Sequence, residues 1–204
     1  MAEETADMQA HRITDYAETK ETFRIEVPEY FNFGYDVIDA WAAKDRNKLA
    51  LIWVSQNGEE KKYTFRDIKN LSNQAANILL KYGINKSDRI LVMLPRIPEW
   101  WIFAIALIKL GAVFCPCPTM LTAKDLLYRI NRGGFKMVIT DFENSGKIDE
   151  ICSSCTSLST RFLVDGEIEG SWYGNDTTWR MVLDLNRIVR YGTREGALSD
   201  TPQR

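Results

Sequence analysis

The sequence predicts a doubly wound, mostly parallel α/β sheet preceded by an N-terminal β-hairpin. Three observations carry this prediction. Helix and strand patterns alternate from residue 67 to residue 166, and residues 89–118 read as strand, helix and strand. Two short strand patterns also flank Asn57-Gly58, a pair typical of hairpin turns. A strand–helix–strand unit of this length forms a right-handed crossover between parallel strands, so residues 89–118 are the expected nucleus of the fold.

The expected nucleus has clear start and stop signals. Residues 90–94 are an apolar run typical of a strand covered on both faces. Pro98 suits the first position of a helix, since its missing N–H is not needed there, and the apolar helix continues over residues 100–110. Gly111 supplies a left-handed helix end, and residues 112–117 form the second strand.

Before this nucleus, the pattern predicts one helix and one hairpin. Asn32 is a suitable cap for a helix that runs to Trp41 with an apolar stripe on one side. Strands are expected at residues 49–54 and 60–65. They are joined at Asn57-Gly58, where both residues tolerate positive φ.

Two later helices begin with the same capping pattern. In each, a threonine is followed three residues later by an aspartate that can answer its hydroxyl: Thr64 with Asp67, and Thr122 with Asp125. These helices are expected to end at Gly83 and at Gly133-Gly134. The remaining predicted elements are strands at 137–140 and 161–164 and a helix at 148–152.

We expect three regions along the chain. Residues 1–29 are charged and poor in large apolar groups, which predicts a mobile leader. Residues 30–170 form the α/β region. Residues 171–204 are divergent and weakly structured, although the apolar residues between Trp172 and Leu185 allow one more short helix.

Composition disfavours two classes of partner. The chain has 204 residues, 45% of them apolar, and a net charge of −2 with no basic cluster, so neither nucleic acid nor an anionic membrane is favoured. The longest apolar run is shorter than the roughly 18 residues that span a bilayer. Residues 1–9 lack an apolar signal core, and a cytoplasmic protein is expected.

The four cysteines allow two interpretations. They occur as Cys115-x-Cys117 and Cys152-x-x-Cys155, and the single histidine is His11. A zinc site would need all four thiolates brought together. Packing is favoured, because Cys115 and Cys117 lie in a predicted buried strand where cysteine acts as a small apolar side chain.

Common catalytic motifs are absent from the sequence. It has no Gly-x-x-x-x-Gly-Lys-Ser/Thr loop, no Gly-x-Gly-x-x-Gly after a strand and no Gly-x-Ser-x-Gly elbow. The Trp100-Trp101 pair could line an apolar ligand channel. Within an apolar helix, however, packing in the core is the favoured interpretation.

Five segments in order resemble the AMP-forming acyl-CoA synthetases, a family of adenylate-forming enzymes, and in particular their medium-chain branch. The segments cover much of residues 30–166 and are 31–41 (FNFGYDVIDAW), 63–68 (YTFRDI), 94–101 (LPRIPEWW), 108–116 (IKLGAVFCP) and 119–129 (TMLTAKDLLYR). The resemblance implies the N-terminal subdomain of the adenylate-forming fold.

The resemblance also implies a reaction and its cofactors. A carboxylic acid attacks ATP, with Mg²⁺ screening the phosphates, to give an acyl-adenylate and pyrophosphate; coenzyme A then displaces AMP. The family's Ser/Thr/Gly-rich phosphate loop, aromatic-Thr-Glu segment, ribose-binding Asp and C-terminal Lys are not found in this sequence. By the resemblance, the functional surface that this sequence retains is the loop over residues 118–122, and the resemblance implies that Met120 lies near the coenzyme A path. Arg129 is a candidate contact for an anionic ligand, although a solvated arginine at a helix end is the favoured interpretation.

Two hypotheses of function follow. In the first, the chain is the N-terminal portion of a medium-chain acyl-CoA synthetase, inactive alone, and produced by truncation, altered splicing or a frame change near residue 170. In the second, it is a non-catalytic module that binds a partner, a ligand or itself through an exposed apolar surface. A flavodoxin-like ligand-binding domain is disfavoured by the hairpin and the ordered motifs.

Overall fold

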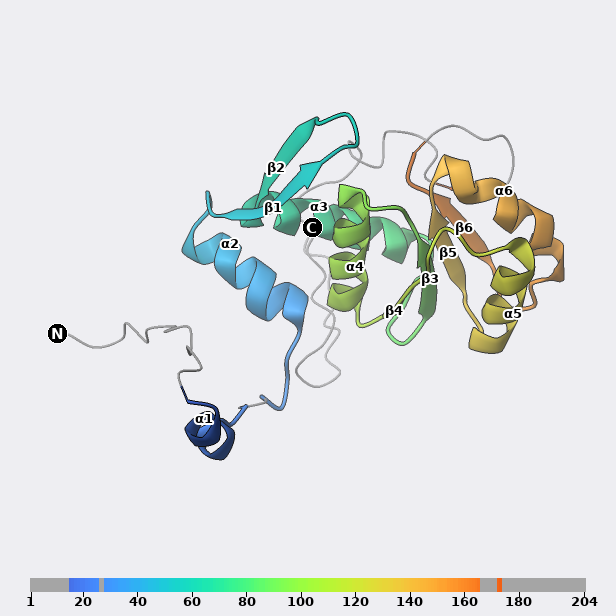
Figure 1. Ribbon diagram of the computed structural model, residues 1–204. Helices are drawn as coiled ribbons and strands as arrows, with labels where there is room; N and C mark the ends of the chain where they lie inside the picture. Colours follow the sequence, from blue (N-terminus) through green and yellow to red (C-terminus); the bar gives the residue numbers. More distant parts are fainter. Residues whose placement is uncertain (1–14, 26–27, 166–171, 174–204) are drawn as a thin grey trace, which may run out of the picture. The chain divides into compact units, whose positions relative to one another are not determined.

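The computed structural model describes residues 15–25, 28–165 and 172–173 (Figure 1). By its internal contacts the chain divides into two units, residues 1–31 and residues 32–204. In the first unit, helix α1 (Tyr16–Thr22) is capped by Asp15, whose carboxylate accepts the N–H of Glu18. The other positions of the predicted mobile leader, 1–14 and 26–27, lie outside the described residues.

The second unit contains an antiparallel hairpin and a five-stranded parallel sheet, which confirms the predicted fold class. The strands of the sheet lie in the order β4-β3-β5-β6-β7, and every paired neighbour in it is parallel. In chain order the elements are η1 (Phe33–Asp39), α2 (Ala40–Lys44), β1 (Leu49–Val54), β2 (Glu60–Thr64), α3 (Phe65–Lys81), β3 (Arg89–Met93), α4 (Pro98–Leu110), β4 (Val113–Pro116), α5 (Ala123–Gly133), β5 (Met137–Thr140), α6 (Phe142–Ile151), η2 (Cys152–Ser154), β6 (Thr160–Leu163) and β7 (Trp172–Tyr173).

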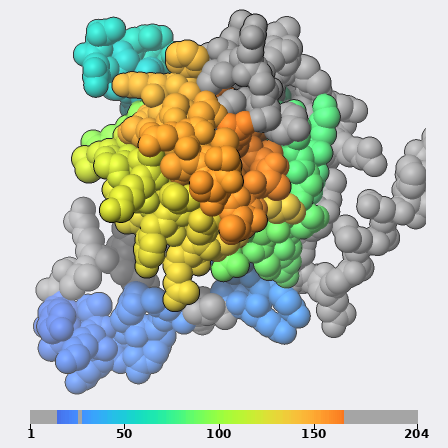
Figure 2. All heavy atoms as spheres, turned by 90° about the vertical axis from the view of Figure 1, so that its right-hand side faces the viewer, coloured from blue at the N-terminus to red at the C-terminus, as the bar shows by residue number. Residues whose placement is uncertain are grey.

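Helices cover both faces of the parallel sheet. Along β3, Ile90 and Val92 face one layer, and Leu91 and Met93 face the other, as the alternation of a strand requires. The first layer is α3 with α4, and the second is α5 with α6. The outer side of α5 and α6 is seen in Figure 2, coloured yellow-green to orange. Two-sided burial explains why the strands read as continuous apolar runs.

Helix ends follow the local signals. Both predicted capping boxes form: the Thr64 hydroxyl accepts the N–H of Asp67 at 3.2 Å, and the Asp67 carboxylate accepts the N–H of Thr64 at 2.9 Å. Thr122 and Asp125 repeat the arrangement. Pro98 occupies the first turn of α4, and Gly111 ends it with φ of 66°.

The hairpin turn uses one left-handed residue. The hairpin forms at Asn57-Gly58 as predicted; Gly58 has φ of 81°, whereas Asn57, which also tolerates positive φ, does not adopt it. The Gly58 N–H donates to the carbonyl of Ser55, and the Ser55 N–H donates to the carbonyl of Glu59. The closing pair Ser55 and Glu59 therefore encloses three residues, one more than a two-residue turn, and the left-handed Gly58 is the last of them.

The segment after Asn32 is helical as predicted, but its first part is a π-helix, η1. The Asn32 side chain accepts the N–H of Gly34 at 3.0 Å and donates to the carbonyl of Ile108 in α4 at 2.8 Å. The Lys109 ammonium, 1% exposed, donates to Asp39 at 2.7 Å and to Asn73 in α3 at 2.8 Å. This polar cluster joins η1, α3 and α4.

Two further positions differ from the sequence predictions. Strand β4, expected to be buried, is partly exposed because, among the described strands, it pairs on one side only, with β3. Residues 172–173, expected in a helix, form β7 beside β6. The rest of that predicted helix and the tail over residues 174–204 lie outside the described residues.

Gly34 and Gly146 offer a matched pair of glycine substitutions. A Cβ on Gly34 would lie 2.4 Å from Cγ of the buried Lys109, whereas nothing lies within 4 Å of a Cβ on Gly146 in α6. We expect Gly34→Ala to lower the free energy of unfolding by about 1–3 kcal/mol. Gly146→Ala should raise it by about 0.5–1 kcal/mol, since alanine is the better helix former. Urea denaturation of both variants measures this, and a neutral Gly34→Ala would contradict the close packing.

The capping box of α3 predicts a pH dependence. The hydrogen bond from Thr64 lowers the pKa of Asp67 below its usual 3.8, so the ionised carboxylate stabilises the fold at neutral pH. We expect Asp67→Asn to cost about 0.5–1 kcal/mol at pH 7. The difference from the unsubstituted chain should shrink once the pH falls below 3.8, and vanish below the lowered pKa. Denaturation between pH 2.5 and 7 tests this, with the exposed Glu150→Gln as the control; a pH-independent difference would contradict it.

Candidate functional site

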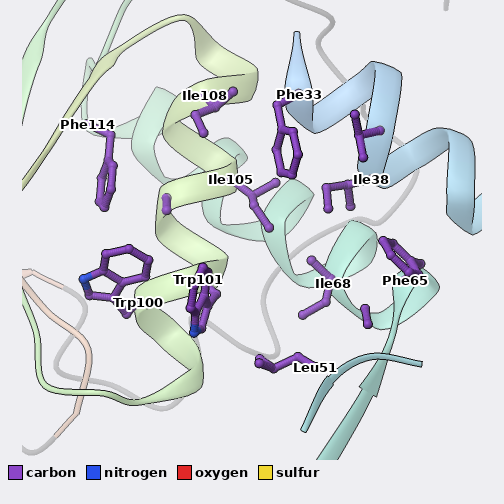
Figure 3. A pocket seen from close by; sticks show the side chains of 13 residues that line it. Phe33, Ile38, Leu51, Phe65, Ile68, Trp100, Trp101, Ile105, Ile108 and Phe114 are labelled. Carbon is purple, nitrogen blue, oxygen red and sulfur yellow. The ribbon is translucent and has the colours of Figure 1, made fainter. Parts of the chain in front are cut away.

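An apolar groove of about 470 Å³ lies between η1, the hairpin, the first part of α3, and α4 (Figure 3). All of its lining side chains are carbon-rich: Phe33, Val37, Ile38, Ala50, Leu51, Phe65, Ile68, Trp100, Trp101, Ala104, Ile105, Ile108 and Phe114. A volume of this size is within the range of small-molecule sites, about 300–1,000 Å³. The groove is partly open to solvent.

Helix α4 forms the floor of this groove. Its residues Ala104 and Ile105 are buried, Ile108 is half-buried, and Trp101 is 50% exposed at the edge. Because these positions are three or four apart, they share one side of the helix. The opposite side of α4, with Phe103 and Leu107, packs in the core against the parallel sheet. A helix that is apolar all round therefore serves two apolar surfaces.

Aromatic rings line both ends of the groove. At one end the Trp100 ring meets Trp101 and Phe114 edge-on, with centroids 4.7 Å and 5.2 Å apart. At the other end Phe65 lies beside Trp41, with ring centroids 5.9 Å apart. The sequence interpretation that favoured core packing for Trp100 and Trp101 is thus incomplete. Both side chains line an apolar surface, as the alternative interpretation held.

A second region of interest, which is polar, lies at the carboxyl ends of the parallel strands. Lys147 of α6 donates to the carbonyl of Thr119 at 2.5 Å and to Asn144 at 3.1 Å, and so holds the loop after β4. Asp141 caps α6 through the N–H of Asn144 at 3.2 Å. In open α/β sheets, ligands bind beyond these strand ends.

The two candidate site residues of the sequence lie in this second region. Met120 is 85% exposed in the loop after β4, and Arg129 is exposed on α5. Neither residue lines the apolar groove. Arg129 and Lys147 act electrostatically on the buried Cys117, but burial dominates and raises the pKa of its thiol. The coenzyme A assignment of Met120 and Arg129 stays a prediction.

The cysteines do not form a metal site in the described part of the chain. All four are free thiols, and no group of three or more His, Cys, Asp or Glu side chains there is placed to hold a metal ion. Cys117 is buried, as predicted, whereas Cys115 is half-buried on the edge strand. Burial also raises the pKa of the Cys115 and Cys155 thiols, which disfavours their thiolates. We therefore assign no ligands for Mg²⁺ among these residues.

Sequence reasoning missed two features of the groove. Phe33 and Val37 come from the π-helix, whose wider turn the 3.6-residue period does not describe. Ala50 and Leu51, adjacent in sequence, both line the groove, and the pairing of β1 with β2 shifts register between Leu49 and Leu51. A bulge turns neighbouring side chains toward one side, and alternation alone does not reveal it. The Trp100-Trp101 pair was the one signal in the sequence.

A known family of enzymes matches most of this chain. The sequence model of the family described as AMP-binding enzyme matches residues 38–184. The chain belongs to this family. The resemblance predicted from the ordered motifs is thereby confirmed, as is the α/β fold that it implied.

Relatives of this AMP-binding family member include acyl-coenzyme A synthetases. Acyl-coenzyme A synthetase ACSM3, mitochondrial, of Mus musculus is 37% identical over 92% of this chain and 32% of that protein. Acyl-coenzyme A synthetase ACSM4, mitochondrial, of Homo sapiens is 35% identical over 83% of this chain and 30% of that protein. The chain thus spans about a third of the length of the relatives it matches.

Solved structures show the same fold. An acyl-CoA synthetase of Brucella canis superposes with a TM-score of 0.64 at 22% identity, over 78% of this chain and 29% of that one. The anthranilate CoA ligase AuaEII, in complex with anthranoyl-AMP, superposes with a TM-score of 0.60 at 23% identity. That match covers 67% of this chain and 25% of the ligase.

In the described residues, no helix is long and apolar enough to cross a membrane.

The division of α4 into a groove side and a core side makes a testable prediction. Trp101→Ala should cost less than about 1.5 kcal/mol of unfolding free energy, because its side chain is half exposed. Phe103→Ala, two residues on and fully buried, should cost about 3–5 kcal/mol. Urea denaturation of the two variants gives the comparison. Equal losses would place Trp101 in the core and remove it from the groove.

Proposed function

We propose that this chain is the N-terminal part of an AMP-forming medium-chain acyl-CoA synthetase. The observation that carries the proposal is the family match over residues 38–184, together with relatives that are acyl-coenzyme A synthetases. In the proposed reaction, a carboxylate oxygen of a medium-chain acid bonds to the α-phosphorus of ATP and pyrophosphate leaves. The thiol sulfur of coenzyme A then bonds to the acyl carbon, and AMP leaves. Mg²⁺ supplies charge screening at the phosphates when bound.

The residues of this chain would contribute scaffold and a coenzyme A-facing loop to that reaction. The loop after β4 is held at Thr119 by Lys147. Met120 projects into solvent, and Arg129 adds a second cation on α5. Cations near exposed backbone suit the phosphates of coenzyme A.

We further propose that the 204 residues alone do not catalyse the reaction. The family's phosphate-binding loop and its C-terminal lysine are not found in this sequence, and the described residues offer no metal-binding group. ATP, Mg²⁺ and coenzyme A are then cofactors of the longer enzyme and bind this chain weakly. On this view residues 30–170 are the α/β part of the AMP-binding domain, after a leader of 29 residues and before a divergent tail.

A non-catalytic binding module is the second candidate. The apolar groove favours it, because monomeric proteins rarely leave a large contiguous apolar surface exposed. The partly exposed β4 offers a further surface, since it has a partner on one side only among the described strands, and an unpaired strand edge can pair with another chain. Self-association through either surface would follow.

Acid-dependent release of pyrophosphate from ATP tests the proposed reaction. The purified chain is assayed with octanoate, butyrate or benzoate in the presence of Mg²⁺ and coenzyme A, after circular dichroism has shown cooperative unfolding. An established acyl-CoA synthetase serves as the positive control. We expect no release above the enzyme-free rate from this chain and octanoate-dependent release from a longer product of the same gene. Acid-dependent release by the 204 residues themselves would overturn the claim of inactivity.

Two cellular locations are considered for this protein, the cytoplasm and the mitochondria. The sequence predicts the cytoplasm, whereas the names of the relatives place those proteins in mitochondria. Fractionation of cells that express the full chain with a C-terminal tag decides between them.

A further inference from the structure

The apolar groove has a cationic end. At that end, Phe65 lies beside Trp41, and the Phe65 N–H donates to the carbonyl of Lys48 at 3.0 Å. The ammonium of Lys48 lies 4.1 Å from the centroid of the Trp41 ring, and that of Lys44 lies 5.0 Å from it. Two positive charges are thus gathered on one aromatic ring, next to the mouth of a carbon-lined groove.

These two lysines are available to an anion. Both are exposed, and in the part of the chain that the structure describes neither makes an ion pair with a carboxylate within 4.0 Å. The nearest carboxylate in sequence, Asp45, accepts the N–H of Asn47 at 3.0 Å. Arg46 adds a third exposed cation to the same turn. The turn from Lys44 to Lys48 therefore carries a net positive charge.

We propose that this groove binds an amphipathic anion, a molecule with an unbranched alkyl chain and a carboxylate head. The chain lies along the α4 floor, over Ala104 and Ile105 toward Trp101, and the head meets the ammonium groups of Lys44 and Lys48. The groove excludes a second charge along its length, because every lining side chain is apolar. The site is separate from the carboxyl edge of the parallel sheet and does not depend on the proposed ligase activity.

Physical magnitudes favour this class of ligand over a purely apolar or purely anionic one. Each methylene buried in a carbon-lined groove contributes enough to change affinity about three- to fourfold. Exposed ammonium groups contribute less, since water and salt screen them, so the lysines select the head and the groove holds the chain. A short anion such as acetate should not bind measurably.

Decanoate, below its micelle-forming concentration and without ATP or coenzyme A, is the probe for the first experiment. Isothermal titration of the 204-residue chain should show saturable binding, and octanoate should bind about tenfold more weakly, because it buries two fewer methylenes. Ala50 lines the groove and is exposed, so Ala50→Trp should fill the groove with an indole ring and abolish binding. The matched control is Val54→Trp, on the same strand, exposed and outside the groove lining; it should leave affinity unchanged.

The head group is tested by removing charge. Lys44→Gln with Lys48→Gln should weaken decanoate binding about fivefold to tenfold at low salt. Lys124→Gln with Arg132→Gln removes the same net charge from α5, across the sheet, and should have no effect. Decyltrimethylammonium, with the same chain and the opposite charge, should bind at least about tenfold more weakly than decanoate.

Three results would overturn the proposal. Decanoate could fail to bind the folded chain, or bind Ala50→Trp and the unsubstituted chain equally well. Thirdly, light scattering could show a dimer that Ala50→Trp converts to a monomer, which would make a second copy of this chain the occupant. None of these results bears on pyrophosphate release, so failure here and failure of the proposed function are distinguishable.

Discussion

The burial of the Lys109 charge is the constraint on which the arrangement of η1, α3 and α4 depends. Burial lowers the pKa of Lys109, and its ion pair with Asp39 opposes that shift. An isolated buried ammonium is costly, so the ion pair with Asp39 and the hydrogen bond to Asn73 must form together. Each partner comes from a different element. Gly34 lacks a side chain where the stem of Lys109 passes, and η1 therefore lies against α4.

That contact creates the groove. With η1 held against one part of α4 and the hairpin connected to α3 through the capped Thr64, no other described element covers the outer side of α4 between them. The same helix packs Phe103 and Leu107 against the sheet on its inner side. Large uncovered apolar surfaces are rare in monomeric proteins and commonly mark a site where something binds. The ammonium groups of Lys44 and Lys48 on Trp41 favour an anionic ligand with an alkyl chain as the occupant of this groove.

The family match covers most of this chain, but this chain covers only part of the proteins to which the proposed acyl-CoA synthetase reaction belongs. Family membership rests on residues 38–184, most of the sequence. The reaction needs phosphate chemistry, and the 204 residues span about a third of the relatives' length. The carboxyl edge, with Lys147 holding Thr119, is a scaffold on which such chemistry is commonly built. The groove is a second and independent surface.

The sequence by itself determined the elements with local causes. Capping boxes at Thr64 and Thr122 and the left-handed Gly111 set helix ends through bonds within a few residues, and continuous apolar strands required two helical layers. Only the tertiary structure decided the site. The π-helix, the shifted register of the hairpin and the partners of Lys109 depend on contacts between distant segments, Asp39 lying 70 residues from Lys109. Periodicity reports which side of a helix is apolar, but not which of two neighbours that side will meet. The two tryptophans of α4 were therefore assigned to the core, although both line the groove.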